Sequence, residues 1–374
     1  MPKRSQAKKA PKVLEAAVSA EDLKQPFQEL DLPLQPPFPP MEAKLVDSIP
    51  SGALWQYEPK WDGFRCLAFR DGNTVELQSK AGQPLGRYFP EVVEALPKLK
   101  PTKFVLDGEI VILLNGHLSF DDLLMRIHPA ESRIKKLSVA TPATYLVFDL
   151  LVDDKAHLLV NETQAARRER LELFFRTFKG SASIRLSPMT RDHAEAEKWM
   201  RNLAVTGFDG VVAKALDQTY QSGERAMRKI KRIRTADCVV GGFRYASKGG
   251  EVGSLLLGVY NDEGQLDHIG FSSAFAKDER KQLRNILKPY MNGEGFTGKA
   301  PGGPSRWSTE RSGEWERLDP KLVCEVSYDH FSGGRFRHGT KFLRWRPEKD
   351  PKSCTYEQIT PTKQGGAMDQ FLAA

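Results

Sequence analysis

The sequence contains little cysteine, and its four cysteines are far apart, at Cys66, Cys238, Cys324 and Cys354. There is no Cys-x-x-Cys pair, and no histidine lies at the spacing of a metal ligand. A zinc module needs such closely spaced ligands, and a disulfide framework needs a dense cysteine pattern. The pattern therefore argues against both and indicates reduced thiols in an intracellular protein.

Long hydrophobic runs are also missing. No apolar stretch approaches the ~20 residues of a membrane-spanning helix, and the basic first residues lack the apolar core of a signal peptide. We therefore expect a cytoplasmic protein without a membrane partner. Basic residues exceed acidic ones, 56 to 48, which gives a net charge of +8. This balance favours an acidic or polyanionic partner.

The chain has room for two or three domains. We expect residues 1–34, with a basic head and a proline run, to be a disordered tail. The mixture of strands and helices in residues 35–235 predicts an α+β domain with antiparallel sheets. Short strands and one helix in residues 236–360 predict a small barrel such as an OB-fold, with an SH3-like barrel as the alternative. Residues 361–374 are expected to be a flexible tail.

Strand patterns dominate the α+β region. We expect a hairpin with strands at 66–69 and 74–77, and further strands at 104–113, 145–151 and 210–214. Helices are expected between the later strands. One would begin near Asn161 or Thr163, and another would run from Asp192 to about Gly207.

The most informative motif is the run from Glu58 to Arg65, which contains Lys60-Trp-Asp-Gly63. A lysine is a nucleophile only when deprotonated, and its ordinary pKa is about 10.4. Desolvation, or a nearby cation such as Arg65 or a metal, would be needed to lower that pKa. Gly63 would let the backbone turn beside a bulky ligand. Alone, the motif is more typical of a surface turn.

Four further features have a chemical interpretation. Glu109 interrupts an apolar strand, where a carboxylate needs a metal, a hydroxyl or a cation, unless it faces water. Phe148 could stack on a nucleobase or belong to the core. Asp209 is a candidate metal ligand or a strand-entry turn residue. Lys229 and Lys231 would share one strand face, where their ammonium groups repel unless an anion lies between them.

Two basic stretches, at residues 225–234 and 335–349, have the composition of a phosphate or nucleic-acid surface. The second alternates cations with aromatic residues. Either stretch alone would be more typical of a solvated basic face.

Taken in order, these motifs resemble a known family. They are Lys60-x-Asp-Gly, Leu106-Asp-Gly-Glu109, Phe148-Asp-Leu-Leu, Asp209-Gly-Val-Val-Ala-Lys214, Lys229-Ile-Lys231 and Arg344-Trp-Arg346-Pro-Glu-Lys349. Their order and spacing resemble the nucleotidyltransferase motifs of ATP-dependent DNA ligases, in particular the bacterial LigC-type enzymes. The resemblance covers roughly residues 35–360.

The resemblance implies that Lys60 attacks the α-phosphate of ATP and becomes covalently linked to AMP. The AMP would then move to a DNA 5′-phosphate, and a 3′-hydroxyl would displace it and seal the nick. Glu58 would contact the adenine edge and Phe148 would stack on its face. Arg65 and Glu109 would lie around the ribose and the nick phosphate.

Further roles follow from the same resemblance. Glu109 and Asp209 would be near Mg²⁺, with Mn²⁺ as a possible substitute. Other residues would bind the phosphates of ATP: Lys214, Lys229 and Lys231, and in the barrel Arg344, Arg346 and Lys349. Three more are expected to bind DNA: Lys80, Arg335 and Arg337. The barrel would close over ATP and then swing away, with a hinge near residues 232–238.

The implied partners are nicked duplex DNA and a DNA-end-binding repair protein, and the implied state is a nucleoid-associated monomer. Three positions depart from the common pattern: Asp209 stands where glutamate is usual, Lys80 where arginine is frequent, and Met227 where tryptophan is frequent. The alternatives are an RNA ligase, a capping-type nucleotidyltransferase, or a non-catalytic OB-fold nucleic-acid binder.

Overall fold

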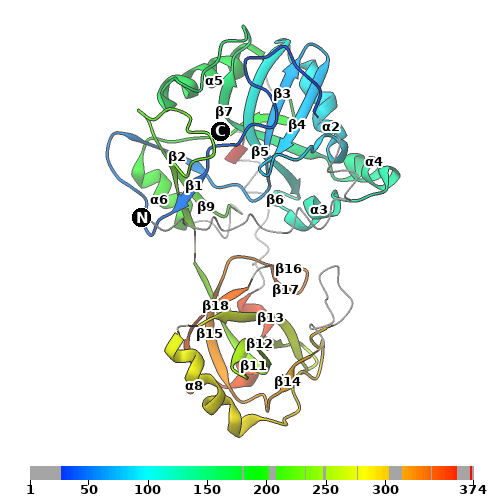
Figure 1. Cartoon of the computed structure of the whole chain (residues 1–374), viewed down its shortest axis with the longest axis vertical. Helices are drawn as coiled ribbons and strands as arrows, with labels where there is room; N and C mark the ends of the chain where they lie inside the picture. Colours follow the sequence, from blue (N-terminus) through cyan, green and yellow to red (C-terminus); the bar gives the residue numbers. More distant parts are fainter. Residues whose placement is uncertain are drawn as a thin grey trace, which may run out of the picture. The chain divides into compact units, whose positions relative to one another are not determined.

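The computed structural model describes the chain in nine segments. They are residues 27–178, 181–201, 208–231, 233–246, 250–275, 277–302, 314–337, 339–359 and 371–372. The chain divides into two compact units (Figure 1). Unit 1 comprises Met1–Lys231 and Lys363–Ala374, and unit 2 comprises Arg232–Thr362. Among the described residues no helix is both long and apolar enough to span a bilayer.

Unit 1 contains two sheets. The first has the order β1-β10-β9-β2 and the second β4-β3-β5-β7-β8, with β6 paired to β5. Strands of the first sheet are β1 (Ala43–Leu45), β2 (Trp55–Pro59), β9 (Gly210–Ala215) and β10 (Met227–Lys231). Strands of the second are β3 (Phe64–Asp71), β4 (Thr74–Ser79), β5 (Lys103–Leu114), β6 (His117–Leu118), β7 (Ala143–Val152) and β8 (Ile184–Leu186). The predicted hairpin and strands are confirmed.

The second sheet is buried on both faces because its side chains alternate between two cores. In β3, Cys66 and Ala68 belong to one cluster, whereas Leu67 and Phe69 belong to another. Such a period of two is the geometry of a strand. Every residue of β7 is buried, which explains its nearly continuous apolar sequence.

Five described helices belong to unit 1. They are α2 (Pro90–Ala95), α3 (Phe120–Met125), α4 (Glu131–Ala140), α5 (Gln164–Phe178) and α6 (His193–Arg201). Thr163 is the residue that caps α5, since its hydroxyl accepts a hydrogen bond from the Ala166 amide at 3.3 Å. The expected continuation of α6 to Gly207 lies outside the described residues.

The described residues of unit 2 form a five-stranded barrel with one α-helix. Its strands are β11 (Arg234–Tyr245), β12 (Val252–Tyr260), β13 (Leu266–Ala274), β15 (Val323–Tyr328) and β18 (Thr340–Trp345), and its helix is α8 (Lys277–Leu287). Short strands accompany it: β14 (Glu316–Arg317), β16 (Phe331–Ser332) and β17 (Arg335–Phe336).

The barrel closes because β11 pairs with both β12 and β15. Around it the order is β11-β12-β13-β18-β15, with β13 and β18 parallel and the other pairs antiparallel. This is the five-stranded Greek-key topology of an OB-fold, with the helix between its third and fourth strands. The predicted OB-fold is therefore confirmed, and the SH3-like alternative is wrong.

Both expected tails contain packed residues. Leu30, Leu32 and Leu34 were assigned to a disordered tail, but they are at most 8% exposed and pack in the cluster that contains Leu67 and Phe69. Burial of these leucines holds residues 27–34 against the second sheet, which corrects that expectation for them. Residues 1–26 lie outside the described residues. The second exception is Phe371, which packs in unit 1 although a flexible tail was expected there.

Candidate active site

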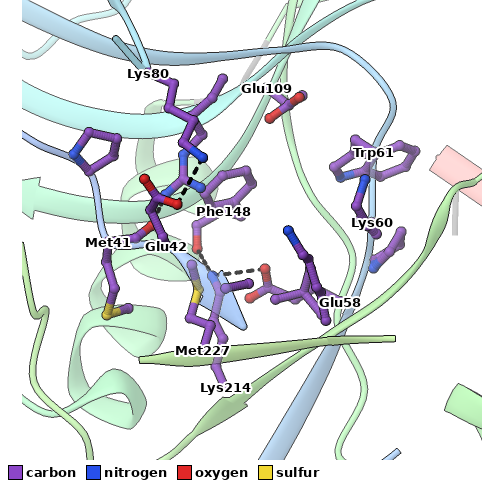
Figure 2. Close-up of a pocket in the computed structure, with 16 residues that line it drawn as sticks. Met41, Glu42, Glu58, Lys60, Trp61, Lys80, Glu109, Phe148, Lys214 and Met227 are labelled. Carbon is purple, nitrogen blue, oxygen red and sulfur yellow. Dashed lines mark hydrogen bonds and ion pairs between the residues drawn. The ribbon is translucent and has the colours of Figure 1, made fainter. Parts of the chain in front are cut away.

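One cavity of unit 1 brings together eight of the predicted site residues (Figure 2). They are Glu58, Lys60, Arg65, Lys80, Glu109, Phe148, Lys214 and Lys229. Strand register explains part of this arrangement. In the first sheet Val212 of β9 is opposite Glu58 of β2 on one side and Lys229 of β10 on the other. In the second sheet Arg65 is directly opposite Glu109.

Lys60 follows the end of β2 and is paired with Asp209 at the start of β9. The Lys60 Nζ to Asp209 Oδ2 distance is 2.5 Å. Burial lowers the pKa of Lys60, but Asp209, together with the charges of Asp62 and Glu109, outweighs it and leaves that pKa above its usual value. The sequence indicated that desolvation, or a cation such as Arg65 or a metal, would be needed to lower this pKa, but in the structure the surrounding carboxylates raise it.

Gly63 is required by close packing rather than by a turn. A Cβ at this position would lie 2.3 Å from the carbonyl oxygen of Ile110 in the neighbouring β5. Backbone at that distance cannot accommodate a side chain without moving. Gly63 therefore lets the segment that carries Lys60 lie directly against the second sheet.

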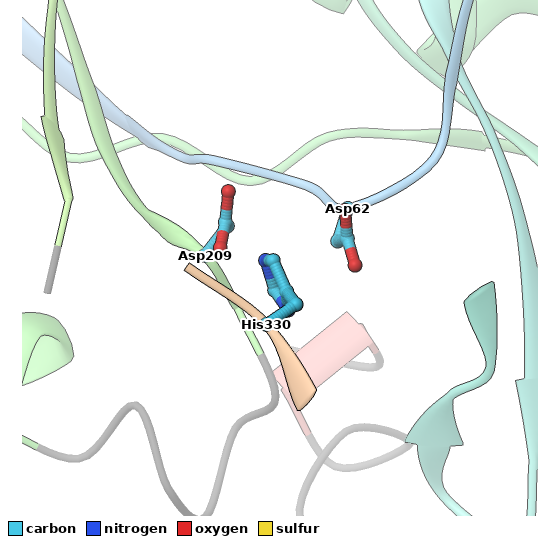
Figure 3. Close-up of side chains that lie close together, drawn as sticks. All are labelled: Asp62, Asp209 and His330. Atoms are coloured by element: carbon cyan, nitrogen blue, oxygen red, sulfur yellow. The ribbon is translucent and has the colours of Figure 1, made fainter. Parts of the chain in front are cut away.

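Three carboxylates lie around Lys60. Oxygens of Asp62 and Asp209 come within 4.8 Å of each other (Figure 3). Burial raises the pKa of Glu109 to about 7, against the opposing effect of Arg65 and Lys60. Carboxylate oxygens are the ligands that Mg²⁺ prefers, so the Asp62 and Asp209 pair fits a divalent cation, and a nearby cation would favour the ionised form of Glu109.

A buried ion pair forms one end of the cavity. Lys214 Nζ is 2.8 Å from Glu58 Oε2, and both side chains are 3% exposed. Gln56 Nε2 donates to the other carboxylate oxygen of Glu58 at 2.8 Å. The two donors hold the Glu58 carboxylate in one orientation at the cavity wall.

Phe148 lies between the two sheets with cations on its ring. The guanidinium carbon of Arg65 and the Nζ of Lys214 are each 4.7 Å from the ring centroid. Lys214 also donates to the Phe148 carbonyl oxygen at 3.2 Å. Lys214 therefore contacts both Glu58, the carboxylate expected at the adenine edge, and Phe148, the ring expected at the adenine face. The sequence alone had placed Lys214 only in a motif and gave no sign of these two contacts.

The partner of Arg65 was missed by the sequence analysis. Arg65 donates from Nε and from one Nη to the two oxygens of Asp107, both at 2.6 Å. Tyr220 donates its hydroxyl to the same carboxylate at 2.7 Å. Asp107 is fully buried, so this fork fixes the guanidinium beside the cavity. Asp107 was visible in the motif Leu106-Asp-Gly-Glu109, but no sequence signal pointed to Tyr220.

Three lysines whose positive charges repel one another line the same cavity, Lys60, Lys80 and Lys229, and Lys231 lies beyond its lining on β10. Lys229 and Lys231 lie two residues apart on β10, as predicted, and Lys231 Nζ is 3.3 Å from Asp209 Oδ2. Burial lowers the pKa of Lys229, and the nearby charges of Lys60, Lys231 and Lys80 lower it further. Lys80 itself pairs with Glu42 at 2.9 Å. Such mutual repulsion is relieved when an anion binds among the lysines.

The remaining predicted cations belong to unit 2. Arg346 Nη1 is 2.9 Å from Asp237, and Lys349 Nζ is 3.6 Å from the same carboxylate. Arg344 pairs with Glu325 at 2.7 Å. Two more candidates lie at the short strand β17: Arg335 is its first residue, and Arg337 directly follows its end.

Two sheets around a lysine-rich cavity, followed by an OB-fold barrel, define a nucleotidyltransferase of the covalent type. Comparisons with known proteins narrow that class. The family model "ATP dependent DNA ligase domain" matches residues 40–231, and "ATP dependent DNA ligase C terminal region" matches residues 248–349.

Relatives agree with the family models. "DNA ligase C1" of Mycolicibacterium smegmatis is 42% identical over 341 residues, which are 88% of this chain and 96% of that protein. "Multifunctional non-homologous end joining protein LigD" of the same organism is 29% identical over 310 residues, which are 81% of this chain and 37% of that protein. A solved chain described as Pmar-Lig_PreS3 shares the fold, with a TM-score of 0.53 and 19% identity over 78% of this chain and 63% of that one.

The chain belongs to the ATP-dependent DNA ligases, and it resembles the LigC-type enzymes in sequence over most of its length. Its activity is ATP-dependent ligation of DNA. The family resemblance stated from the motifs is thereby confirmed.

Proposed function

We propose that Lys60 is the residue that accepts AMP. Its amine attacks the α-phosphorus of ATP, a phosphorus–nitrogen bond forms, and the α–β phosphorus–oxygen bond breaks to release pyrophosphate. A DNA 5′-phosphate oxygen then takes the AMP from Lys60. The 3′-hydroxyl across the nick finally attacks the activated phosphorus, AMP leaves, and the strand is sealed.

The observation that carries this proposal is the group of lysines that line one cavity, Lys60, Lys80 and Lys229, with Lys231 beside them at Asp209. Burial and the positive charges of Lys60, Lys231 and Lys80 destabilise the charged form of Lys229. The negative charge of a bound α-phosphate of ATP would offset this repulsion. Lys229 and Lys231 would thus hold that phosphate as charge develops on it. Lys60 must lose its proton before it attacks, and release from Asp209 favours that loss.

The opposite end of the cavity would bind the base. Glu58, held by Gln56 and Lys214, presents an acceptor to the adenine edge, and Phe148 offers its ring to the base. Arg65, fixed by Asp107, would contact the ribose and the nick phosphate. Glu109 and Asp209 would hold Mg²⁺ or Mn²⁺, which when bound supplies positive charge against the phosphate oxygens.

Unit 2 would supply the remaining contacts. We assign the adenylation domain to residues 35–235 and the OB-fold domain to residues 236–360. Three of its cations, Arg344, Arg346 and Lys349, would orient the leaving pyrophosphate in line with Lys60. Nicked duplex DNA would contact Lys80 in unit 1 and Arg335 and Arg337 in unit 2.

A role in DNA repair, beside an end-binding protein and as a monomer, is proposed from the likeness to the end-joining protein LigD. That relative is named for non-homologous end joining, and this chain matches 37% of its length. Purified protein mixed with broken DNA, with and without an end-binding protein, would test whether such a partner raises the rate of joining.

Radiolabelled ATP tests the proposed role of Lys60. The parent protein should acquire acid-labile label from α-labelled ATP and pass it to nicked DNA. Lys60→Ala should acquire no label and seal no nick, whereas Lys44→Ala, which changes an exposed lysine of β1, should behave like the parent. If Lys60→Ala joined breaks as fast as the parent, the proposal would be wrong.

A further inference from the structure

Phe371 packs into an aromatic pocket of unit 1 that no motif predicts. Its ring centroid lies 4.7 Å from Phe208, 5.5 Å from Trp199 and 6.5 Å from Trp61, each in an edge-to-face arrangement. Figure 2 shows the pale red ribbon of the last described residues beside Trp61. Edge-to-face rings at these distances attract one another beyond the burial of their area.

Two residues of this aromatic pocket are direct sequence neighbours of Lys60 and of its ion-pair partner Asp209. Trp61 follows Lys60, and Phe208 precedes Asp209. The Trp61 and Phe208 rings are 5.1 Å apart, while the Lys60 and Asp209 side chains form the 2.5 Å ion pair. The aromatic pair therefore directly adjoins the ion pair along both segments.

Backbone hydrogen bonds join these two segments. The Lys60 amide donates to the Gly210 carbonyl at 2.9 Å, and the Asp209 amide donates to the Lys60 carbonyl at 2.9 Å. The Trp61 indole nitrogen also donates to the Ser187 hydroxyl at 2.9 Å. A shift of the Trp61 ring would therefore move the Lys60 backbone and its bond to the Asp209 segment together.

We propose that Phe371 is a positioning residue for the transfer of AMP to Lys60. It packs on Trp61 and Phe208 and so holds the backbone that aims the Lys60 amine at the α-phosphate. This inference rests on the proposed role of Lys60. Phe371 does not line the cavity, and Phe148, the ring expected at the base, lies on β7, so ATP binding should depend on Phe371 less than adenylation does.

The test separates positioning from binding. Phe371→Ala should slow single-turnover formation of lysyl-AMP about tenfold, equivalent to one aromatic contact of about 1.4 kcal/mol. The KM for ATP should change less than about twofold. Sealing of a pre-adenylated nick should stay within about twofold of the parent, because the 3′-hydroxyl and not Lys60 attacks in that step.

Conservative and control variants sharpen the result. Phe371→Trp, which keeps an aromatic edge, should restore most of the rate, and Leu173→Ala, which changes an exposed side chain of α5 (55% exposed), should leave it unchanged. An unchanged adenylation rate in Phe371→Ala would overturn the proposal. So would an equal loss in adenylation and in sealing of pre-adenylated nicks, which is the signature of a general loss of fold.

Failure of this inference can be told apart from failure of the proposed function. If Lys60→Ala acquires no label while Phe371→Ala reacts like the parent, only the positioning role is wrong. If Lys60→Ala still acquires label on another residue, the role of Lys60 itself is wrong.

Discussion

Replacement of Lys214 by methionine should damage both stability and ATP use. Methionine has a similar length but no charge, so the variant leaves Glu58 as a buried carboxylate with Gln56 as its one remaining described side-chain donor. Removing one partner of a buried ion pair costs about 3–5 kcal/mol. For a domain of this size that loss lowers the melting temperature by about 6–20 °C.

The effect on ATP follows from the same contacts. Lys214 is 4.7 Å from the Phe148 ring and donates to its carbonyl. Without it, the carboxylate and the ring that would bind adenine lose their common support, and the KM for ATP in self-adenylation should rise about tenfold or more.

A double-mutant cycle provides the assay. Glu58→Gln, Lys214→Met and the double variant are compared by thermal unfolding and by adenylation kinetics. The double variant has no unpaired buried charge, so it should recover at least about 2 kcal/mol relative to the sum of the single variants. Additive losses in the cycle would refute the reasoning, because they would mean that the pair does not interact.

Three further predictions concern other parts of the chain. Arg346→Gln should slow self-adenylation but spare sealing of pre-adenylated nicks; neutral glutamine is preferable to charge reversal, which would place an acid 2.9 Å from Asp237. Gly63→Ala should lower the melting temperature, since its Cβ would lie 2.3 Å from the Ile110 carbonyl oxygen. Burial and two arginines lower the pKa of His268 from 6.5 to about 4. As the pH falls, His268 therefore binds a proton in the unfolded chain at a higher pH than in the folded chain. Unit 2 should accordingly lose up to about 3 kcal/mol of stability as pH falls from 6.5 to 4. His268→Phe should remove that loss in pH-dependent melting.

Much of the fold was predictable because its signals are local. The alternation of Cys66, Leu67, Ala68 and Phe69, and the turn after them, specify a hairpin strand without reference to the rest of the chain. The single helix among short strands likewise predicted the barrel of unit 2. The tails were predicted from composition, and composition cannot show that Leu30 or Phe371 finds a complementary pocket far away in the sequence.

The identity of the site followed from motif order, but its electrostatics did not. From Lys60 and Arg65 alone we expected that desolvation or a nearby cation would be needed to lower the lysine pKa. In the folded chain Arg65 instead pairs with Asp107, and Lys60 pairs with Asp209, which is 149 positions away along the chain. The register of the strands determines which charged side chains become neighbours. This register cannot be deduced from any local sequence pattern.

The amino-acid sequence by itself determined the kind of protein: a basic chain with six ordered motifs, a lysine available for AMP and a terminal barrel. Tertiary structure alone decided the pairing of Lys214 with Glu58 and the two hydrogen bonds from Arg65 to Asp107. It also decided the packing of Phe371 on Trp61 and Phe208, next to Lys60. The physical reason is that motif chemistry depends on residue type, whereas orientation, pKa and support depend on contacts that form only when distant segments are buried together.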